Sequence, residues 1–149
     1  MLINQDYKDL FVELNAYGVE FLVVGAHALA VHGLVRATKD IDVWVRPASE
    51  NAIRLIAALN AFGAPTQSVT AGDFAVAGVT FQIGIEPVRI DILTVIDGID
   101  FESAWRNRIA ADYGDVPVSV LARSDLIANK LAAGRPQDLA DVAALERQK

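Results

Sequence analysis

Residues 21–45 read FLVVGAHALAVHGLVRATKDIDVWV and contain the strand–helix–strand unit on which the rest of the chain is built. Residues 21–24 are a short apolar run, which is typical of a strand buried on both faces. Residues 26–33 are Ala-rich and apolar on all sides, which indicates a short buried helix that ends at Gly33. A second strand is predicted over 41–45, beginning near Lys39, because β-branched and aromatic residues favour strands and Pro47 ends the run.

The flanking sequence predicts further helices and strands on both sides of this unit. Before it, apolar residues at helical spacing predict an amphipathic helix over 5–17. After it, Ser49 is a candidate N-cap for a helix whose apolar face would carry Ala52, Ile53, Ile56 and Leu59, and residues 66–79 read as a loop. Further along, the sequence predicts a hairpin of 80–83 with 88–93, a helix over 101–106, a pairing of 108–110 with 116–118, and helices over 124–133 and 136–147. This mixture predicts an α/β or α+β domain with a mixed sheet flanked by helices.

Composition places limits on the class of protein. The 149 residues, 53% of them hydrophobic, fit one domain, with a sheet core over about 19–120 and a C-terminal helical pair over about 124–147. The absence of cysteine excludes disulfide scaffolds, zinc ribbons and thiol nucleophiles. A net charge of −6 argues against non-specific binding to DNA or membranes. The N-terminus does not resemble a secretory signal and no long uncharged apolar run occurs, so we expect a cytoplasmic protein.

Three aspartates stand in strands that are otherwise apolar. Asp40 and Asp42 are two residues apart, so both carboxylates point to the same side, roughly 6–7 Å apart along the strand. Asp91 lies in the run VRIDIL over 88–93, where a carboxylate is costly unless a partner compensates it. If the two strands are neighbours, three carboxylates meet, and Mg²⁺ or Mn²⁺ is the natural counter-ion for oxygen-only ligands. Each part alone has a plainer explanation as a solvated strand end, a bulge or an edge position.

Gly25 adds a second feature to this end of the sheet. It follows a buried strand and opens a helix, and at such a junction backbone N–H groups at the helix N-terminus receive phosphate. Glycine also allows a phosphate to approach the backbone closely. The alternative is an ordinary tight turn without a ligand.

These segments resemble the signature of the DNA polymerase β-like nucleotidyltransferase superfamily. The resemblance rests on residues 21–28 (FLVVGAHA), on residues 31–42 (VHGLVRATKDID) and on the C-terminal stretches 125–130 (DLIANK) and 135–141 (RPQDLAD). Within the superfamily, the chain is most similar to small bacterial proteins related to the AbiE abortive-infection toxin. The resemblance extends over about 19–146, and residues 64–80 match no motif of the family.

The resemblance implies a role for each matching residue. Asp40 and Asp42 would bind metal, and Asp91 would hold the second of two Mg²⁺ or Mn²⁺ ions and activate the acceptor hydroxyl. Gly25 and Ala26 would offer backbone amides to the triphosphate of an NTP. Ala26 departs from the family, which has Gly or Ser there, so a hydroxyl contact to phosphate is lost while the backbone donor remains.

Several basic side chains and both histidines can be interpreted either as binding residues or as structural ones. Arg36, Lys39 and Lys130 either contact phosphate or serve local roles, as a partner for a nearby acid or as a lysine that reaches solvent from an apolar helix face. His27 and His32 are five residues apart, which favours structural roles over a shared metal. Trp44 shares a face with Asp42, so it lines the pocket or packs in the core. No P-loop and no Gly-x-Ser-x-Gly motif occurs.

Two hypotheses for function follow. The first is a metal-dependent nucleotidyltransferase that moves a nucleoside monophosphate from an NTP to a hydroxyl of a protein, a tRNA or a small molecule. The second is a catalytically weak module of the same fold that binds a nucleotide or a protein partner, such as a cognate antitoxin or a second subunit. The orientation of Asp91 discriminates between them, because metal chemistry requires it to face Asp40 and Asp42.

Overall fold

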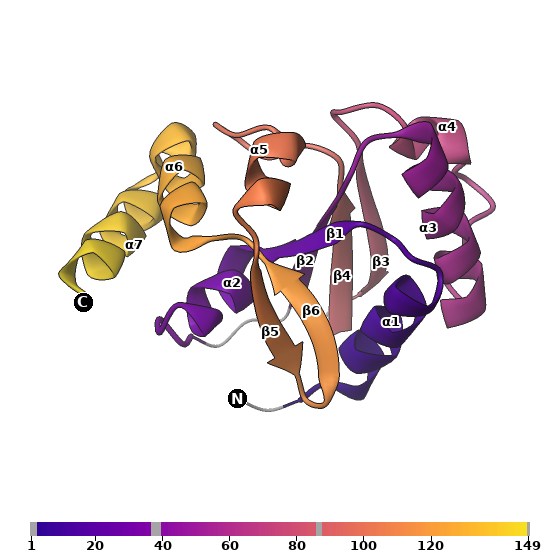
Figure 1. Cartoon of the computed structure of the whole chain (residues 1–149), viewed down its shortest axis with the longest axis horizontal. Coiled ribbons are helices and arrows are strands. Elements are labelled where there is room, and N and C mark those ends of the chain that lie inside the picture. Colours follow the sequence, from indigo (N-terminus) through magenta and orange to yellow (C-terminus); the bar gives the residue numbers. More distant parts are fainter. Residues whose placement is uncertain (1–2, 37–39, 86–87, 149) are drawn as a thin grey trace.

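The fold was examined in a computed structural model that describes residues 3–36, 40–85 and 88–148. One six-stranded mixed sheet forms its centre, with strand order β3-β4-β2-β1-β6-β5 (Figure 1). The strands are β1 (Phe21–Val24), β2 (Asp40–Val45), β3 (Thr80–Ile85), β4 (Val88–Leu93), β5 (Ile109–Tyr113) and β6 (Val116–Val120). The helices are α1 (Gln5–Ala16), α2 (Gly25–Val31), α3 (Ser49–Phe62), α4 (Ala71–Phe74), α5 (Phe101–Arg106), α6 (Arg123–Ala133) and α7 (Pro136–Arg147). The predicted mixed α+β architecture is therefore confirmed.

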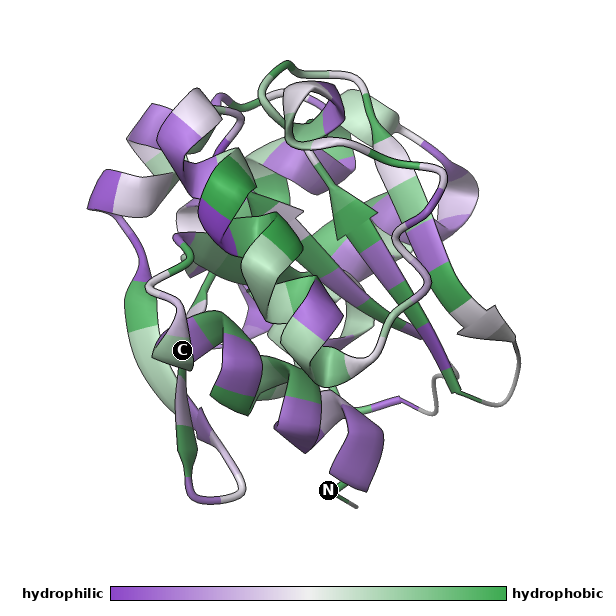
Figure 2. Cartoon of the chain, turned by 90° about the vertical axis from the view of Figure 1, so that its right-hand side faces the viewer, coloured by the Kyte–Doolittle hydropathy of each residue, from purple (hydrophilic) through white to green (hydrophobic). Residues whose placement is uncertain are grey.

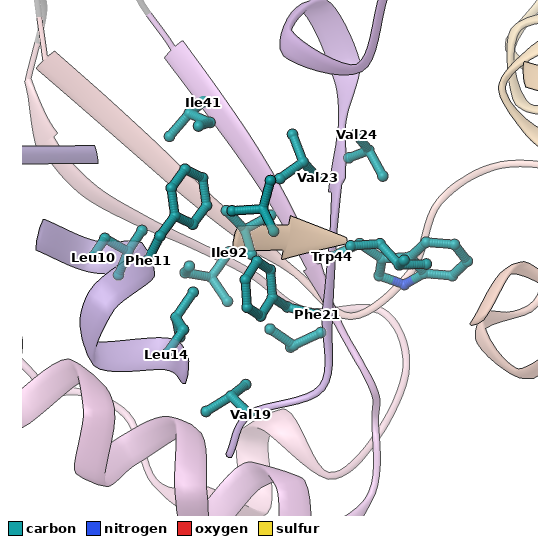
Figure 3. Packing of buried hydrophobic residues seen from close by; sticks show 14 of the residues in the cluster. Leu10, Phe11, Leu14, Val19, Phe21, Val23, Val24, Ile41, Trp44 and Ile92 are labelled. Carbon is teal, nitrogen blue, oxygen red and sulfur yellow. The ribbon is translucent and has the colours of Figure 1, made fainter. Parts of the chain in front are cut away.

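Helices cover both faces of the sheet. In Figure 1, α1, α3 and α4 lie on one side and α5, α6 and α7 on the other, whereas α2 continues from the end of β1 and contacts α1 through His27 and Tyr7. Side chains alternate along β1, so Phe21 and Val23 point to the α1 side while Leu22 and Val24 point to the opposite side. Figure 3 shows the result: Phe11 and Phe21 lie on one side of β1 and Trp44 on the other. The two rings of Phe11 and Phe21 stack with centroids 5.7 Å apart, and both residues are buried.

Most of the predicted elements are confirmed to within one or two residues. The hairpin forms as β3 and β4, and the second pairing forms as β5 and β6. Figure 2 shows hydrophobic and hydrophilic residues alternating along β3 and β4, as expected for strands with one face in the core. The predicted loop over 66–79 contains one short helix, α4, which the sequence analysis missed. A capping box of Thr70 and Asp73 stabilises its first turn.

The predicted N-cap of α3 and one residue of its predicted apolar face are wrong, whereas Ala52, Ile56 and Leu59 face the core as predicted. Ala48 is the N-cap and makes no side-chain hydrogen bond, so Ser49 is the first helical residue and not the cap. Ile53 has 63% of its surface exposed, whereas Leu55 and Leu59 are fully buried. Asn51 is also buried, and its side chain joins the start of α3 to the neighbouring backbone.

Asn51 joins three segments of backbone. Its Oδ1 accepts from the Glu20 N–H at 2.7 Å, and its Nδ2 donates to the carbonyls of Glu20 at 3.0 Å and Arg46 at 3.1 Å. These bonds tie α3 to the entrance of β1 and the exit of β2, so a polar residue is buried here with its groups satisfied.

Replacing Asn51 with alanine is expected to lower the free energy of unfolding by about 1–3 kcal/mol, because the Glu20 N–H loses its acceptor and the carbonyls of Glu20 and Arg46 each lose one of two donors. Urea denaturation checks this prediction. Arg54→Ala, on the exposed side of the same helix, is the matched control and is expected to change stability by less than about 0.5 kcal/mol. Equal effects of the two substitutions would contradict the interpretation.

No helix among the described residues combines the length and apolar character needed to cross a membrane. Residues 37–39 lie outside the described ranges, so the prediction made for Lys39 is not addressed by the structure.

Candidate functional site

Strand order brings the three predicted aspartates to one face of the sheet. β2 lies between β1 and β4, antiparallel to the first and parallel to the second. In this register Asp42 is opposite Val24 on one side and opposite Asp91 on the other. The carboxyl groups of Asp42 and Asp91 lie close enough for the charge of Asp91 to raise the pKa of Asp42. Asp91 therefore faces the Asp40–Asp42 strand, which is the orientation that metal chemistry requires.

Gly25 closes this arrangement from the end of β1. Its φ of +68° lies in the left-handed region, where glycine is favoured. A Cβ at this position would lie 2.3 Å from Oδ2 of Asp42. The Asp42 carboxylate therefore occupies the space that any other residue at position 25 would fill, and α2 begins at that point.

Arg89 is a member of the site that the sequence analysis missed. Its Nη2 lies 2.6 Å from Oδ2 of Asp40 and 3.8 Å from Oδ2 of Asp91. Gln82, from the neighbouring strand β3, donates from Nε2 to Oδ1 of Asp91 at 3.3 Å. The spacing of Arg89 two residues before Asp91 was the available signal, because it puts both side chains on one face of a strand.

The electrostatics of the aspartates favour a bound cation. Burial is the main cause that raises the pKa of Asp42 to about 6, and the charge and hydrogen bond of Asp91 add to it. Asp40 raises the pKa further, while Arg89 opposes the shift. Three carboxylates thus face the single guanidinium of Arg89. The ionised form of Asp42 is disfavoured in this arrangement, and a bound cation would favour it.

A pocket of about 270 Å³ opens beside Gly25 and Asp42. It is bounded by the loop after β4 and by the facing ends of α6 and α7. Asn129 ties this loop to α6, because its Nδ2 donates to the carbonyl of Asp97 at 2.9 Å. The lining residues are Val24, Gly25, Asp42, Leu93, Val95, Ile96, Asp97, Asn129, Lys130, Ala133, Arg135 and Asp138.

A family of nucleotidyltransferases matches nearly the whole chain. Its description is "Nucleotidyltransferase of unknown function (DUF6036)", and the match covers residues 1–146. The chain belongs to this family. It is therefore a transferase by family, and the predicted superfamily is confirmed. A comparison with curated protein sequences found no match.

Solved structures share the fold of this nucleotidyltransferase. A Thermotoga maritima protein described as a nucleotidyltransferase superposes with a TM-score of 0.63 at 14% identity, covering 99% of this chain and 97% of its own. The lincosamide antibiotic adenylyltransferase LnuA, with lincomycin bound, gives 0.60 at 12% identity, with 98% of both chains covered. The antibiotic-resistance factor ANT(2'')-Ia gives 0.62 at 13% identity, covering 95% of this chain and 80% of its own. At these identities the likeness concerns the fold alone.

Of the basic side chains predicted to contact phosphate in this nucleotidyltransferase, Lys130 lines the pocket and Arg36 does not. Lys130 lines the pocket with 12% of its side chain exposed, held by Asp138 at 3.4 Å and Asp141 at 3.0 Å. Arg36 does not line the pocket; both of its terminal nitrogens bond the carboxylate of Asp141. The structure thus shows the ion-pair alternative for Arg36.

Trp44, His27 and His32 make packing or hydrogen-bonding contacts that are consistent with structural roles. Trp44 is 1% exposed and packs edge-on against Phe101, so it lies in the core. His32 Nε2 lies 2.8 Å from the carbonyl oxygen of Leu121. His27 packs against the ring of Tyr7, and burial lowers the pKa of His27. Neither histidine faces the carboxylates as a ligand.

The donor set of the site suits a hard divalent ion. Asp42 and Asp91 present carboxylate oxygens in register on neighbouring strands, and a cation between them would relieve their repulsion. Asp40 is engaged by Arg89, and within residues 3–36, 40–85 and 88–148 no three acidic or histidine side chains are grouped closely enough to hold an ion as they stand. Binding of metal by all three aspartates would require Arg89 to release Asp40.

Proposed function

We propose that this chain transfers a nucleoside monophosphate from an NTP to a hydroxyl group of an acceptor. The observation that carries the proposal is the pocket that joins Gly25 and Asp42 to Lys130, with Asp91 in register beside Asp42. The helix N-terminus at Gly25 and the ammonium of Lys130 form a cradle for the triphosphate, and the carboxylates stand at its edge. Ala26 contributes its backbone N–H in the first turn of α2, in keeping with its predicted nucleotide-binding role.

The proposed reaction is an in-line displacement. The acceptor oxygen forms a bond to the α-phosphorus while the bond to the bridging oxygen breaks, and pyrophosphate leaves. Asp91 accepts the proton of the acceptor hydroxyl. Gln82 orients Asp91, and Lys130 neutralises charge on the phosphates. Asp40, Asp42 and Asp91 would hold Mg²⁺ or Mn²⁺, two ions in the predicted arrangement, which supply charge neutralisation at the phosphate and lower the pKa of the hydroxyl.

The proposal specifies a hydroxyl group as the acceptor, and two classes of molecule could carry it. LnuA binds lincomycin and ANT(2'')-Ia was solved with adenylyl-2''-tobramycin, so two proteins of this fold act on antibiotics. The resemblance to AbiE-related toxins predicts instead a macromolecular acceptor and a cognate antitoxin. These finer assignments stay predictions.

Isothermal titration with non-hydrolysable NTP analogues, with and without Mg²⁺, tests the proposal. The wild type is expected to bind at least one analogue only when Mg²⁺ is present. Asp40→Asn/Asp42→Asn is expected to weaken that binding at least about 100-fold, because two oxygen ligands lose their charge. Labelled NTPs then identify the acceptor.

The matched control is Asp112→Asn/Asp115→Asn, which removes two charges from the β5–β6 hairpin and is expected to leave binding unchanged. If a folded wild type binds none of the four NTP analogues, the nucleotide-dependent enzyme is excluded and the partner-binding module becomes the better hypothesis. Binding that persists without Mg²⁺ and in the site variant would assign the nucleotide to another place on the molecule.

A further inference from the structure

Two carboxylates of α7 are almost completely buried beside the pocket. Asp138 and Asp141 each have 1% of their surface exposed. Burying a charge costs several kcal/mol unless partners compensate it, so each carboxylate needs a reason to be there. For Asp138 that reason is local: it accepts from the backbone N–H of Arg135 at 3.2 Å and from Nε at 2.6 Å, which stabilises the first turn of α7.

Asp141 has no such local reason. It lies beyond the first turn of α7, where a carboxylate does not cap the helix. Its partners come from three places: Arg36 before β2, Lys130 on α6 at 3.0 Å, and Gln137 on its own helix at 2.9 Å. Burial alone would raise the pKa of Asp141, but these hydrogen bonds outweigh burial and lower it, so the group is ionised at neutral pH.

The same contacts determine where the ammonium of Lys130 lies. A lysine has three N–H donors. Asp141 Oδ2 and Asp138 Oδ1 receive two of them, at 3.0 and 3.4 Å, while the ammonium lines the pocket. Lys130 is a long side chain with many rotamers, and two carboxylates at fixed positions restrict it to one of them.

We propose that Asp141 is a positioning residue that holds Lys130 toward the triphosphate. The inference rests on the proposed function and deepens it. Arg36 supplies the charge that lets Asp141 stay ionised without drawing the ammonium away from the pocket. Arg36, Lys130 and Arg135 carry one more charge than Asp138 and Asp141, so this end of the pocket is basic while Asp42 and Asp97 line the rest of it.

Removing the charge of Asp141 distinguishes a positioning role from a purely electrostatic one, because the two roles predict opposite changes in nucleotide affinity. If Asp141 acts only as a negative charge near the phosphates, Asp141→Asn tightens binding of the Mg²⁺ complex of a non-hydrolysable ATP analogue. If it positions Lys130, Asp141→Asn weakens that binding about tenfold, and Asp141→Glu, which keeps the charge but moves it, weakens it too. We expect the second pattern in isothermal titration, with Asp112→Asn as the control that carries the same change of charge.

Acetylation of Lys130, followed by mass spectrometry without nucleotide, provides a second readout. We expect Asp141→Asn to accelerate modification of Lys130 at least about fivefold, because its ammonium is no longer held by two carboxylates, whereas other lysines keep their rates. Thermal denaturation verifies that each variant is folded at the assay temperature.

The outcomes are distinct. If the wild type binds nucleotide and Asp141→Asn binds it equally or more tightly, the positioning role is overturned while the proposed function stands. If the wild type fails to bind nucleotide, the proposed function fails, and the acetylation rate alone then decides whether Asp141 holds Lys130. An unchanged acetylation rate in Asp141→Asn overturns the inference in either case.

Discussion

Replacing Asp42 with asparagine is expected to stabilise the fold while abolishing Mg²⁺-dependent nucleotide binding. Burial and the neighbouring carboxylates raise the pKa of Asp42 from its ordinary value of 3.8 to about 6 in the folded chain. The folded state therefore binds more protons than the unfolded state between these pH values, so the free energy of unfolding falls as pH rises from about 4 to about 6. Above about pH 6, Asp42 is ionised in the folded state, and the unfavourable free energy of that buried charge lowers stability in full. Asparagine carries no charge and removes this destabilisation.

The size of this effect follows from the shift. About two pKa units correspond to roughly 3 kcal/mol, and sharing of the proton with Asp91 makes about 1–3 kcal/mol the expected gain at pH 8. For a chain of this size, that gain raises Tm by about 3–8 °C. Thermal denaturation at pH 5 and pH 8 without divalent ions measures it, and the gain should be much smaller at pH 5, where Asp42 is mostly protonated.

Two comparisons make the Asp42 prediction specific. Asp112→Asn, on the exposed side of β5, is expected to show no such dependence on pH. Mg²⁺ at pH 8 is expected to stabilise the wild type but not Asp42→Asn, because a ligand that binds only the native site raises the stability of that state. A variant that is less stable than the wild type at pH 8 would show that the carboxylates are compensated without a metal.

Replacing Gly25 with alanine is expected to disrupt the site, because the added Cβ would clash with the carboxylate of Asp42. The φ of +68° alone costs a residue with a Cβ about 1–2 kcal/mol. In addition, the new Cβ would lie 2.3 Å from Oδ2 of Asp42, so the carboxylate must leave its place beside Asp91. We expect Gly25→Ala to lose at least about 100-fold in affinity for the NTP analogue, measured by isothermal titration, and to lose about 2–4 kcal/mol of stability in urea denaturation.

Gly18 offers a matched control for the Gly25 prediction. Its φ is +69°, but nothing lies within 4 Å of the Cβ that alanine would add. Gly18→Ala should therefore show the conformational cost alone and leave nucleotide binding intact. In an Asp42→Ala background, Gly25→Ala should cost no more than Gly18→Ala, because the clashing carboxylate is gone. Equal costs of the two glycine substitutions in the wild type would show that the contact with Asp42 is unimportant.

The elements near the site were predictable because their signals are local. An apolar run ending in Gly25 predicts a buried strand and the start of a helix, and the structure has β1 and α2 there. The alternation in VRIDIL predicts a strand with Asp91 on the face opposite Ile90 and Ile92, and both isoleucines are buried. Such patterns depend only on the periods of strands and helices, which every segment carries in its own residues.

Partnerships between distant residues could not be predicted in the same way. The apolar face predicted for α3 included Ile53, which is exposed, and nothing in the helix pattern indicated that polar Asn51 would be buried against the backbone of Glu20. Arg36 is 105 residues from Asp141, and nothing in either segment indicates that they form an ion pair. Arg89 binds Asp40 only because β4 lies beside β2 in one particular register.

Local sequence was thus enough to identify the carboxylates, the glycine and the strands that carry them, since side-chain type and periodicity are properties of short segments. Tertiary structure alone decided that Asp42 lies in register beside Asp91, that Arg89 engages Asp40, and that Lys130 is held by two buried aspartates at the pocket wall. The physical reason is that the charge state and reach of these groups depend on strand order and burial. Both arise only when segments far apart in the chain pack together.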